Sequence, residues 1–152
     1  MPRTHTYLFE PGLWSIQGVY YDESERPHAQ TGQIVISHGP KLWTMDSQIQ
    51  ISGEDKRDFV SRYEIVPFPP NVSYTEWKSY AGGPEPLFGL FVVVEETLLA
   101  PWQSQSGQYW GQEALYSQSP DAYLCRGFTF LKERKTSSWA VRLTRESGAT
   151  AN

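Results

Sequence analysis

The sequence predicts an all-β protein, a single antiparallel meander β-barrel of about ten strands. Three observations lead to this prediction. Short runs alternate between apolar and polar residues and are rich in aromatic and β-branched side chains, as in half-buried strands. Polar breaks rich in Gly and Pro separate these runs at a spacing of roughly 8–12 residues. No stretch holds its apolar residues at a helical period for long.

The length indicates one domain. A chain of 152 residues can bury its own core but is not comfortably long enough for two domains. We therefore expect a single barrel domain over residues 1–152, with an N-terminal segment at 1–11 and a frayed polar tail at 147–152. The connections suit a meander, and closing a meander into a barrel removes its exposed edges.

Each expected strand is an alternating run that ends at a turn signal. The first seven are Gly12 to Tyr21, Gly32 to Ser37, Leu42 to Ile51, Asp58 to Phe68, Val72 to Tyr80, Leu87 to Val94 and Thr97 to Trp102. A polar loop is expected at Asp22 to Gln30 and a turn at His38 to Lys41, where Gly and Pro interrupt the pattern. That turn would set Ile36 against Trp43 and Ile34 against Met45.

The last three expected strands are Gly107 to Tyr116, Ala122 to Leu131 and Ser138 to Thr144. Two hairpins would pair Glu113 with Arg126, and Phe130 with Trp139. Opposite residues share one side of a sheet. This inward face would hold Tyr109, Leu115, Leu124, Phe128, Phe130, Trp139, Val141 and Leu143 around the charged pair. Cys125 would then point outward.

A ten-stranded barrel is wider than one that side chains just fill, which favours an interior cavity over a filled core. The expected ligand-binding residues are those predicted to face inward: Arg126, Glu113, Trp14, Tyr20, Trp43, Phe91, Trp102, Tyr109, Phe128 and Trp139. Arg126 would hold a ligand carboxylate or other oxygen, and Glu113 would orient it. Two plainer interpretations stay open: the pair is a structural salt bridge, and the aromatic rings fill the core.

Several classes of function are disfavoured. The net charge is −4 without a basic block, which argues against a nucleic-acid partner. The longest apolar stretch, Leu87 to Val94, is far short of the ~20 residues that a membrane helix needs. No secretory signal is visible at the start, so we expect a cytoplasmic protein. The single cysteine excludes an internal disulfide. His5, His28 and His38 have no metal-ligand spacing, and no cofactor is expected, although His38 could contact a ligand at the barrel mouth.

The start of the first strand, Gly12-Leu13-Trp14, resembles the Gly-x-Trp motif of lipocalins and other calycins. The resemblance implies that Trp14 packs at the barrel base under a basic residue, Arg142 or Arg145. The strand count is similar to the fatty-acid-binding-protein and nitrobindin branches. The chain departs from both, because the loop after the first strand is too short for two helices and no histidine follows His38 to hold haem. Bilin lyases share a barrel, but no motif here connects to them.

Three functions follow from this barrel. The leading hypothesis is a non-catalytic protein that binds an apolar or aromatic small molecule inside. The second is an isomerase, cyclase or lyase acting on a hydrophobic substrate, with Glu113 as general base and Tyr20 or His38 as acid. The third is a filled-barrel interaction module. Leu99, Pro101, Val92 and Trp110 should lie outside and form an apolar patch, which favours a homodimer unless Tyr7-Leu8-Phe9 covers them.

Overall fold

The structure is a computed structural model that describes residues 5–53, 56–81 and 83–146. Its strands are β1 (Gly12–Tyr21), β2 (Pro27–His38), β3 (Trp43–Ile51), β4 (Arg57–Ile65), β5 (Tyr74–Ala81), β6 (Leu87–Val94), β7 (Thr97–Ser104), β8 (Tyr109–Ser119), β9 (Ala122–Leu131) and β10 (Arg134–Arg145). No helix long and apolar enough to cross a membrane occurs in this described part of the chain.

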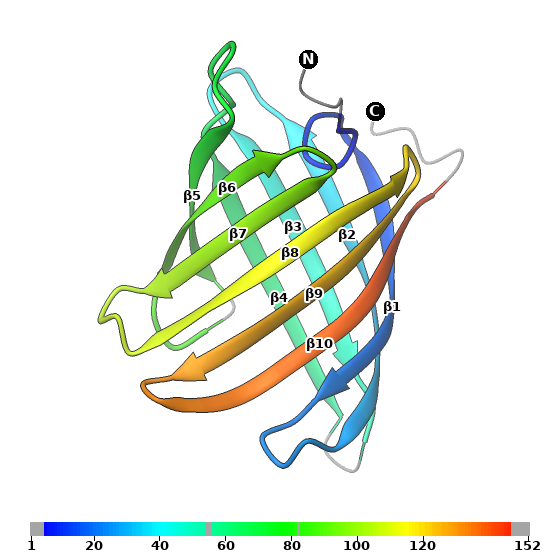
Figure 1. The fold of residues 1–152 in the computed structure, drawn as a ribbon, viewed down its shortest axis with the longest axis vertical. Coiled ribbons are helices and arrows are strands. Elements are labelled where there is room, and N and C mark those ends of the chain that lie inside the picture. Colours follow the sequence, from blue (N-terminus) through cyan, green and yellow to red (C-terminus); the bar gives the residue numbers. More distant parts are fainter. Residues whose placement is uncertain (1–4, 54–55, 82, 147–152) are drawn as a thin grey trace.

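The strands form a closed antiparallel barrel (Figure 1). Each strand pairs with its neighbours in sequence, and β10 closes the ring by pairing with β1. This confirms the predicted fold class. The frayed tail expected at 147–152 lies outside the described residues.

Several strand ends differ from the prediction because the turns are tighter than the polar composition suggests. β2 begins at Pro27, so much of the expected loop is strand. Asp22 closes the short connection that is left, where its carboxylate accepts hydrogen bonds from the backbone N–H groups of Ser24 and Arg26. β10 begins at Arg134, because the chain reverses at Lys132, which has a left-handed φ of 54°. In the hairpin of β2 and β3, Ile36 faces Met45 rather than Trp43, a shift of two that keeps both apolar faces inside.

The expected register of β8, β9 and β10 is wrong, and the error reverses β9. Glu113 pairs with Gly127 rather than Arg126, and Trp139 also pairs with Gly127 rather than Phe130. The ladders shift near both turns, between Ser117 and Ser119 and between Lys135 and Ser137. An odd shift moves every side chain to the other face. Cys125 therefore points inward, and the alternate residues of β9, including Arg126, lie on the outer wall.

Three tryptophans face glycines directly across the sheet, and these contacts account for the observed register. Trp77 pairs with Gly89, Trp102 with Gly111, and Trp139 with Gly127. Each indole lies where the glycine has no side chain. A Cβ built on Gly127 would lie 2.3 Å from Cζ2 of Trp139, and one on Gly89 would lie 2.5 Å from Cζ2 of Trp77. A large ring laid over an inward glycine is a known way to pin strand register.

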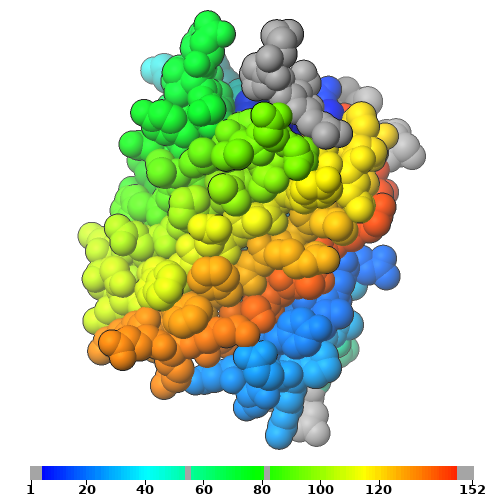
Figure 2. All heavy atoms as spheres, viewed as in Figure 1, coloured from blue at the N-terminus to red at the C-terminus, as the bar shows by residue number. Residues whose placement is uncertain are grey.

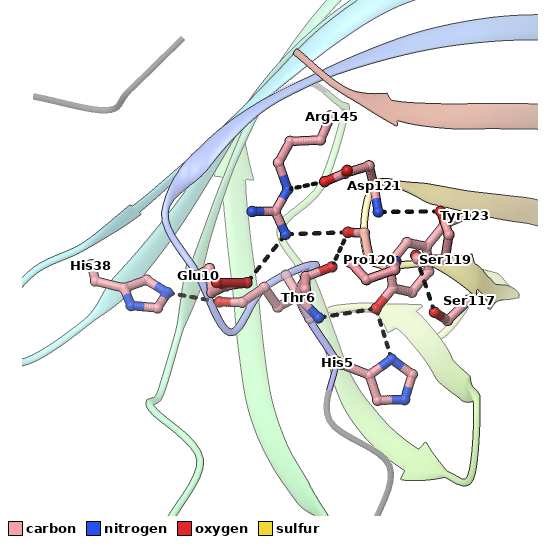
Figure 3. Close-up of polar contacts among 11 residues, drawn as sticks. His5, Thr6, Glu10, His38, Ser117, Ser119, Pro120, Asp121, Tyr123 and Arg145 are labelled. Carbon is pink, nitrogen blue, oxygen red and sulfur yellow. Dashed lines mark hydrogen bonds and ion pairs between the residues drawn. The ribbon is translucent and has the colours of Figure 1, made fainter. Parts of the chain in front are cut away.

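Residues 5–11 form a plug that closes one end of the barrel (dark blue in Figure 1). Tyr7 and Leu8 are buried in the core, so this segment plugs the barrel and does not cover its outer wall. Figure 3 shows the polar contacts that hold it. The His5 ring contacts the Tyr123 hydroxyl through Nδ1 and the Glu95 carbonyl through Nε2, both at 2.8 Å. His38 Nε2 donates to the Leu8 carbonyl at 2.7 Å.

The Trp14 site matches what the calycin resemblance implies. Trp14 is buried and packs edge-on against Tyr7 and Tyr123, with ring centroids 5.3 and 5.6 Å away. The basic residue above it is Arg145, whose Cζ lies 5.3 Å from the indole centroid. The same guanidinium contacts Glu10 of the plug at 3.1 Å (Figure 3). Arg142, the other candidate, is exposed.

The glycine contacts generate a prediction about stability. Gly127→Ala should lower the free energy of unfolding by about 1–3 kcal/mol, because the new methyl group must displace the Trp139 ring from a packed interior. Urea unfolding followed by tryptophan fluorescence measures this loss. Gly83→Ala is the matched control, since a Cβ there meets only the Glu85 carbonyl at 3.9 Å. Equal stability of the two variants would contradict the proposed role of the ring.

Candidate functional site

The barrel contains an interior cavity of ≈ 290 Å³. Tyr7 of the plug lies among its walls, so the plugged end of the barrel forms its floor. Phe59, near the opposite end, lines the cavity yet is 37% exposed, so the cavity reaches solvent there. The remaining walls are Ile16, Tyr20, Gln30, Ile34, Met45, Ser47, Ile49, Ile51, Ser61, Tyr63, Ser79, Leu87, Glu113, Cys125, Ser137, Trp139, Val141 and Leu143.

Glu113 is the polar centre of this cavity. It stands on β8, opposite Gly127 in the ladder. It faces inward, whereas its neighbours Gln112 and Ala114 face outward. Trp139 Nε1–H donates a hydrogen bond to Oε2 at 2.8 Å. Burial raises the pKa of the Glu113 carboxyl, and hydrogen bonds from Trp139 and Cys125 only partly oppose this rise. The cavity therefore holds a carboxyl group that binds a proton more readily than an exposed glutamate does.

The groups near Glu113 keep their own protons. Burial, assisted by the nearby Glu113 carboxylate, raises the pKa of the Cys125 thiol well above its ordinary value. The same two causes raise the pKa values of the Tyr7 and Tyr63 hydroxyls. A thiol or phenol with a raised pKa is neutral at pH 7. These three side chains are hydrogen-bonding groups here and not charges.

Other polar groups of the cavity bond mainly to one another or to the sheet. The hydroxyls of Ser47 and Ser61 are hydrogen-bonded to each other, and the Ser79 hydroxyl donates to the Arg62 carbonyl at 2.8 Å. Gln30 differs. It is only 6% exposed, and its Oε1 has no hydrogen-bond partner among the described residues. A buried carbonyl without a partner costs about 1–3 kcal/mol, which marks Gln30 as a group that a ligand could satisfy.

The structure brings together only part of the expected ligand set. Glu113, Tyr20 and Trp139 line the cavity. Inward-facing residues that are not among its walls are Trp14, Trp43, Phe91, Trp102 and Tyr109. Trp14, Trp43, Phe91 and Trp102 belong to the hydrophobic core instead, and Tyr109 stands at the start of β8.

The predictions for Arg126 and Phe128 are wrong, because the register shift places both on the outer wall. Arg126 is exposed, and its Nη1 donates to the Cys125 carbonyl at 3.0 Å. Phe128 packs edge-on against Trp110 at 6.1 Å between ring centroids. The interior pair of Glu113 and Arg126 therefore does not form.

His38 does not lie at the mouth of the cavity. It stacks on Trp43, with centroids 4.1 Å apart and an interplanar angle of 6°, and holds the plug. His28 contacts Asp22 at 2.8 Å in the connection between β1 and β2. No cluster of three or more potential metal ligands occurs in the described ranges.

Sequence reasoning missed Gln30, Cys125, Tyr63 and Tyr7 as cavity residues. The polar composition around Gln30 predicts a loop. Gln30 nevertheless has the same strand parity as Ile34 and Ile36, and this parity is the signal that could have identified it as facing inward. Tyr63 has the same parity as Ile65 on β4. Tyr7 lies in a short apolar cluster at the N-terminus, and nothing in the sequence indicates that this cluster enters the barrel.

The outer wall over β6–β9 carries apolar side chains, as expected. Val92, Leu99, Pro101 and Trp110 all lie there. Strands β6–β9 cross the face turned to the viewer in Figure 2. Reversal of β9 adds aromatic rings to the outer wall: Trp110 stacks on Phe130 with centroids 4.7 Å apart. Trp110 remains 39% exposed and Phe88 39% exposed. The plug lies at the barrel end and leaves this wall uncovered.

No protein-family model matches this chain, and no curated protein matches it. The fold is similar to two solved structures. One is the S-type phycobiliprotein lyase CPES from Guillardia theta, with a TM-score of 0.66 and 9% identity over 96% of this chain and 95% of that one. The other is EF1p2_mFAP2b bound to DFHBI, with a TM-score of 0.53 and 15% identity over 93% of this chain and 98% of that one. At these identities the likeness shows the barrel fold alone, in line with the calycin-like prediction.

The buried carboxyl predicts a pH dependence of stability. Folding raises the pKa of Glu113, so between its unfolded pKa of roughly 4.3 and its folded value the folded chain holds more protons. The free energy of unfolding should therefore fall as pH rises through this interval. Glu113→Gln cannot ionise and should escape that loss, so its advantage over the native chain should grow with pH. Urea unfolding at several pH values measures it, with the exposed Glu76→Gln as control. Parallel curves for native chain and Glu113→Gln would contradict this account.

Proposed function

We propose that this protein binds a small, largely apolar molecule inside the barrel, with Glu113 as the polar anchor. The observation that carries the proposal is a solvent-reaching cavity whose walls are mostly aliphatic and aromatic and converge on one buried carboxyl. Binding sites for small molecules have this character: an apolar enclosure with few polar groups that fix orientation. Arg126 lies exposed on the outer wall and takes no part in this site.

The size of the cavity limits the ligand. A volume of ≈ 290 Å³ is at the small end of the roughly 300–1,000 Å³ typical of ligand pockets. It suits one or two fused rings better than a long chain. The floor at Tyr7 closes the far end, so the ligand enters past Phe59 and Tyr20. That a barrel of similar fold is bound to the small molecule DFHBI supports this use of the interior.

An enzyme that uses the same cavity is the second candidate. The buried Glu113, with its raised pKa, has the protonation behaviour that a general acid or base requires. Tyr20 lines the cavity and could act as its partner, whereas His38 lies at the plugged end. The similarity in fold to a phycobiliprotein lyase fits this alternative as well. We place it second because Glu113, Trp139 and Cys125 make a binding anchor without requiring any reaction.

Binding inside the barrel can be tested with a neutral N-phenyl-naphthylamine dye, whose emission rises in apolar surroundings. The native chain should bind one dye molecule. Ile49→Trp should weaken binding at least tenfold, about 1.4 kcal/mol, because the indole would fill the cavity that Ile49 lines. Val60→Trp is the matched control on β4, where Val60 is 63% exposed on the outer wall. Failure of the native chain to bind, or equal binding by both variants, would contradict an interior site.

The outer wall over β6–β9 supports a second prediction, a homodimer. Sedimentation velocity of the native chain should show a species of twice the chain mass at micromolar concentration, because paired apolar walls remove exposed rings from water. The double variant Trp110→Ser, Phe130→Ser should be monomeric. Val60→Ser, on the opposite wall, should remain dimeric. A native chain that sediments as a monomer at high concentration would exclude this dimer.

A further inference from the structure

The described residues that line the cavity include an acidic group and no basic group. Glu113 is a carboxyl group, and none of the described residues that line the cavity is Lys, Arg or His. The titratable groups that interact with Glu113 from the packed elements are Cys125 on β9, Tyr63 on β4 and Tyr7 on the plug, and all three hold their protons. Arg126, the nearest guanidinium in sequence to Cys125, is exposed on the outer wall. A negatively charged ligand would find no cation inside.

An anionic ligand is therefore disfavoured. An anion repels the Glu113 carboxylate when this group is ionised, and when the group is protonated the anion is still a buried charge without a cation to pair with. A ligand cation has the opposite effect, because an ionised Glu113 gains the counter-charge that the cavity lacks. A planar amidinium or similar group can bond both oxygens of a carboxylate at once. A neutral N–H or O–H donor can also hydrogen-bond to the carboxylate, but it is stabilised less than a cation is.

Gln30 offers a second polar contact on another wall. Its amide lines the cavity from β2, while Glu113 stands on β8. Oε1 is covered and has no partner in the described structure. The terminal torsion of a glutamine side chain is soft, so the amide can turn toward the cavity at little cost. A ligand donor there would relieve the unsatisfied carbonyl, which a plain hydrocarbon would leave unpaired.

The geometry points to a ligand that is uncharged or cationic, flat and apolar, and that carries N–H or O–H donors for Glu113 and Gln30. This inference rests on the proposed binding function and narrows its ligand class. The same argument disfavours carboxylates such as fatty acids, which an Arg at the bottom of the barrel would have favoured. Selectivity in this site comes from the penalty on the wrong charge as much as from the contacts made to the right one.

The charge rule can be tested with three probes of one shape: naphthalene amidinium, naphthalene carboxamide and naphthalene carboxylate. Calorimetry at neutral pH should show the amidinium and the carboxamide binding at least tenfold tighter than the carboxylate. Glu113→Gln should erase the advantage of the amidinium over the carboxamide, whereas Glu76→Gln, at an exposed position on β5, should keep it. A carboxylate that binds as tightly as the amidinium would overturn the inference. So would a chain that binds the dye but none of the three probes, whereas loss of dye binding would defeat the proposed function itself.

Gln30→Leu tests the second contact with two readouts. Removing a carbonyl oxygen that already lacks a partner should leave the unfolding midpoint unchanged or higher, while affinity for the carboxamide falls at least threefold. Gln33→Leu, at an exposed position of the same strand, is the matched control and should change neither affinity nor selectivity. A lower midpoint with unchanged carboxamide affinity would show that Gln30 is structural and would remove it from the site.

Discussion

The placement of large rings over inward glycines is the constraint on which this structure depends. It fixes the register of the pairs β5–β6, β7–β8 and β9–β10, since Trp77, Trp102 and Trp139 each need an opposite position without a Cβ. The register in turn decides which residues meet inside. With Gly127 turned inward beneath Trp139, the neighbouring Cys125 also points inward, and the indole N–H reaches Glu113. A single packing requirement thus assembles the cavity's polar centre.

The two ends of the barrel divide its work. The plugged end concentrates aromatic rings and ion pairs around Trp14, where Arg145 connects Glu10 of the plug with Asp121 in the turn between β8 and β9. The cavity opens at the other end, and its walls include aliphatic and serine side chains. Functional sites often contain buried polar groups that lack partners, which the rest of a protein avoids. Gln30 and Glu113 fit that description. Oε1 of Gln30 has no partner among the described residues, and Glu113 is a carboxyl group held out of water.

The sequence was sufficient to predict the barrel, because alternation and turn residues define strands without tertiary information. The calycin resemblance also implied a basic residue over Trp14, either Arg142 or Arg145, and the structure shows that it is Arg145. The sequence was insufficient for β9, because both faces of that strand carry large side chains: Tyr123 and Cys125 inside, Phe128 and Phe130 outside. Hydrophobicity cannot decide between such faces, and irregularities of a single residue near the turns reverse them. Because of this ambiguity, only half of the predicted anchor pair is right: Glu113 lines the cavity, and Arg126 does not.

The bond between Glu10 and Arg145 joins residues 135 positions apart, and β1 pairs with β10 along the same seam. The ring can therefore close only after β10 has left the ribosome. Until then β1 carries an unpaired edge that other nascent chains can extend. Contacts of such high sequence separation also slow folding. We expect recovery of soluble protein to depend on how quickly synthesis delivers the final strand.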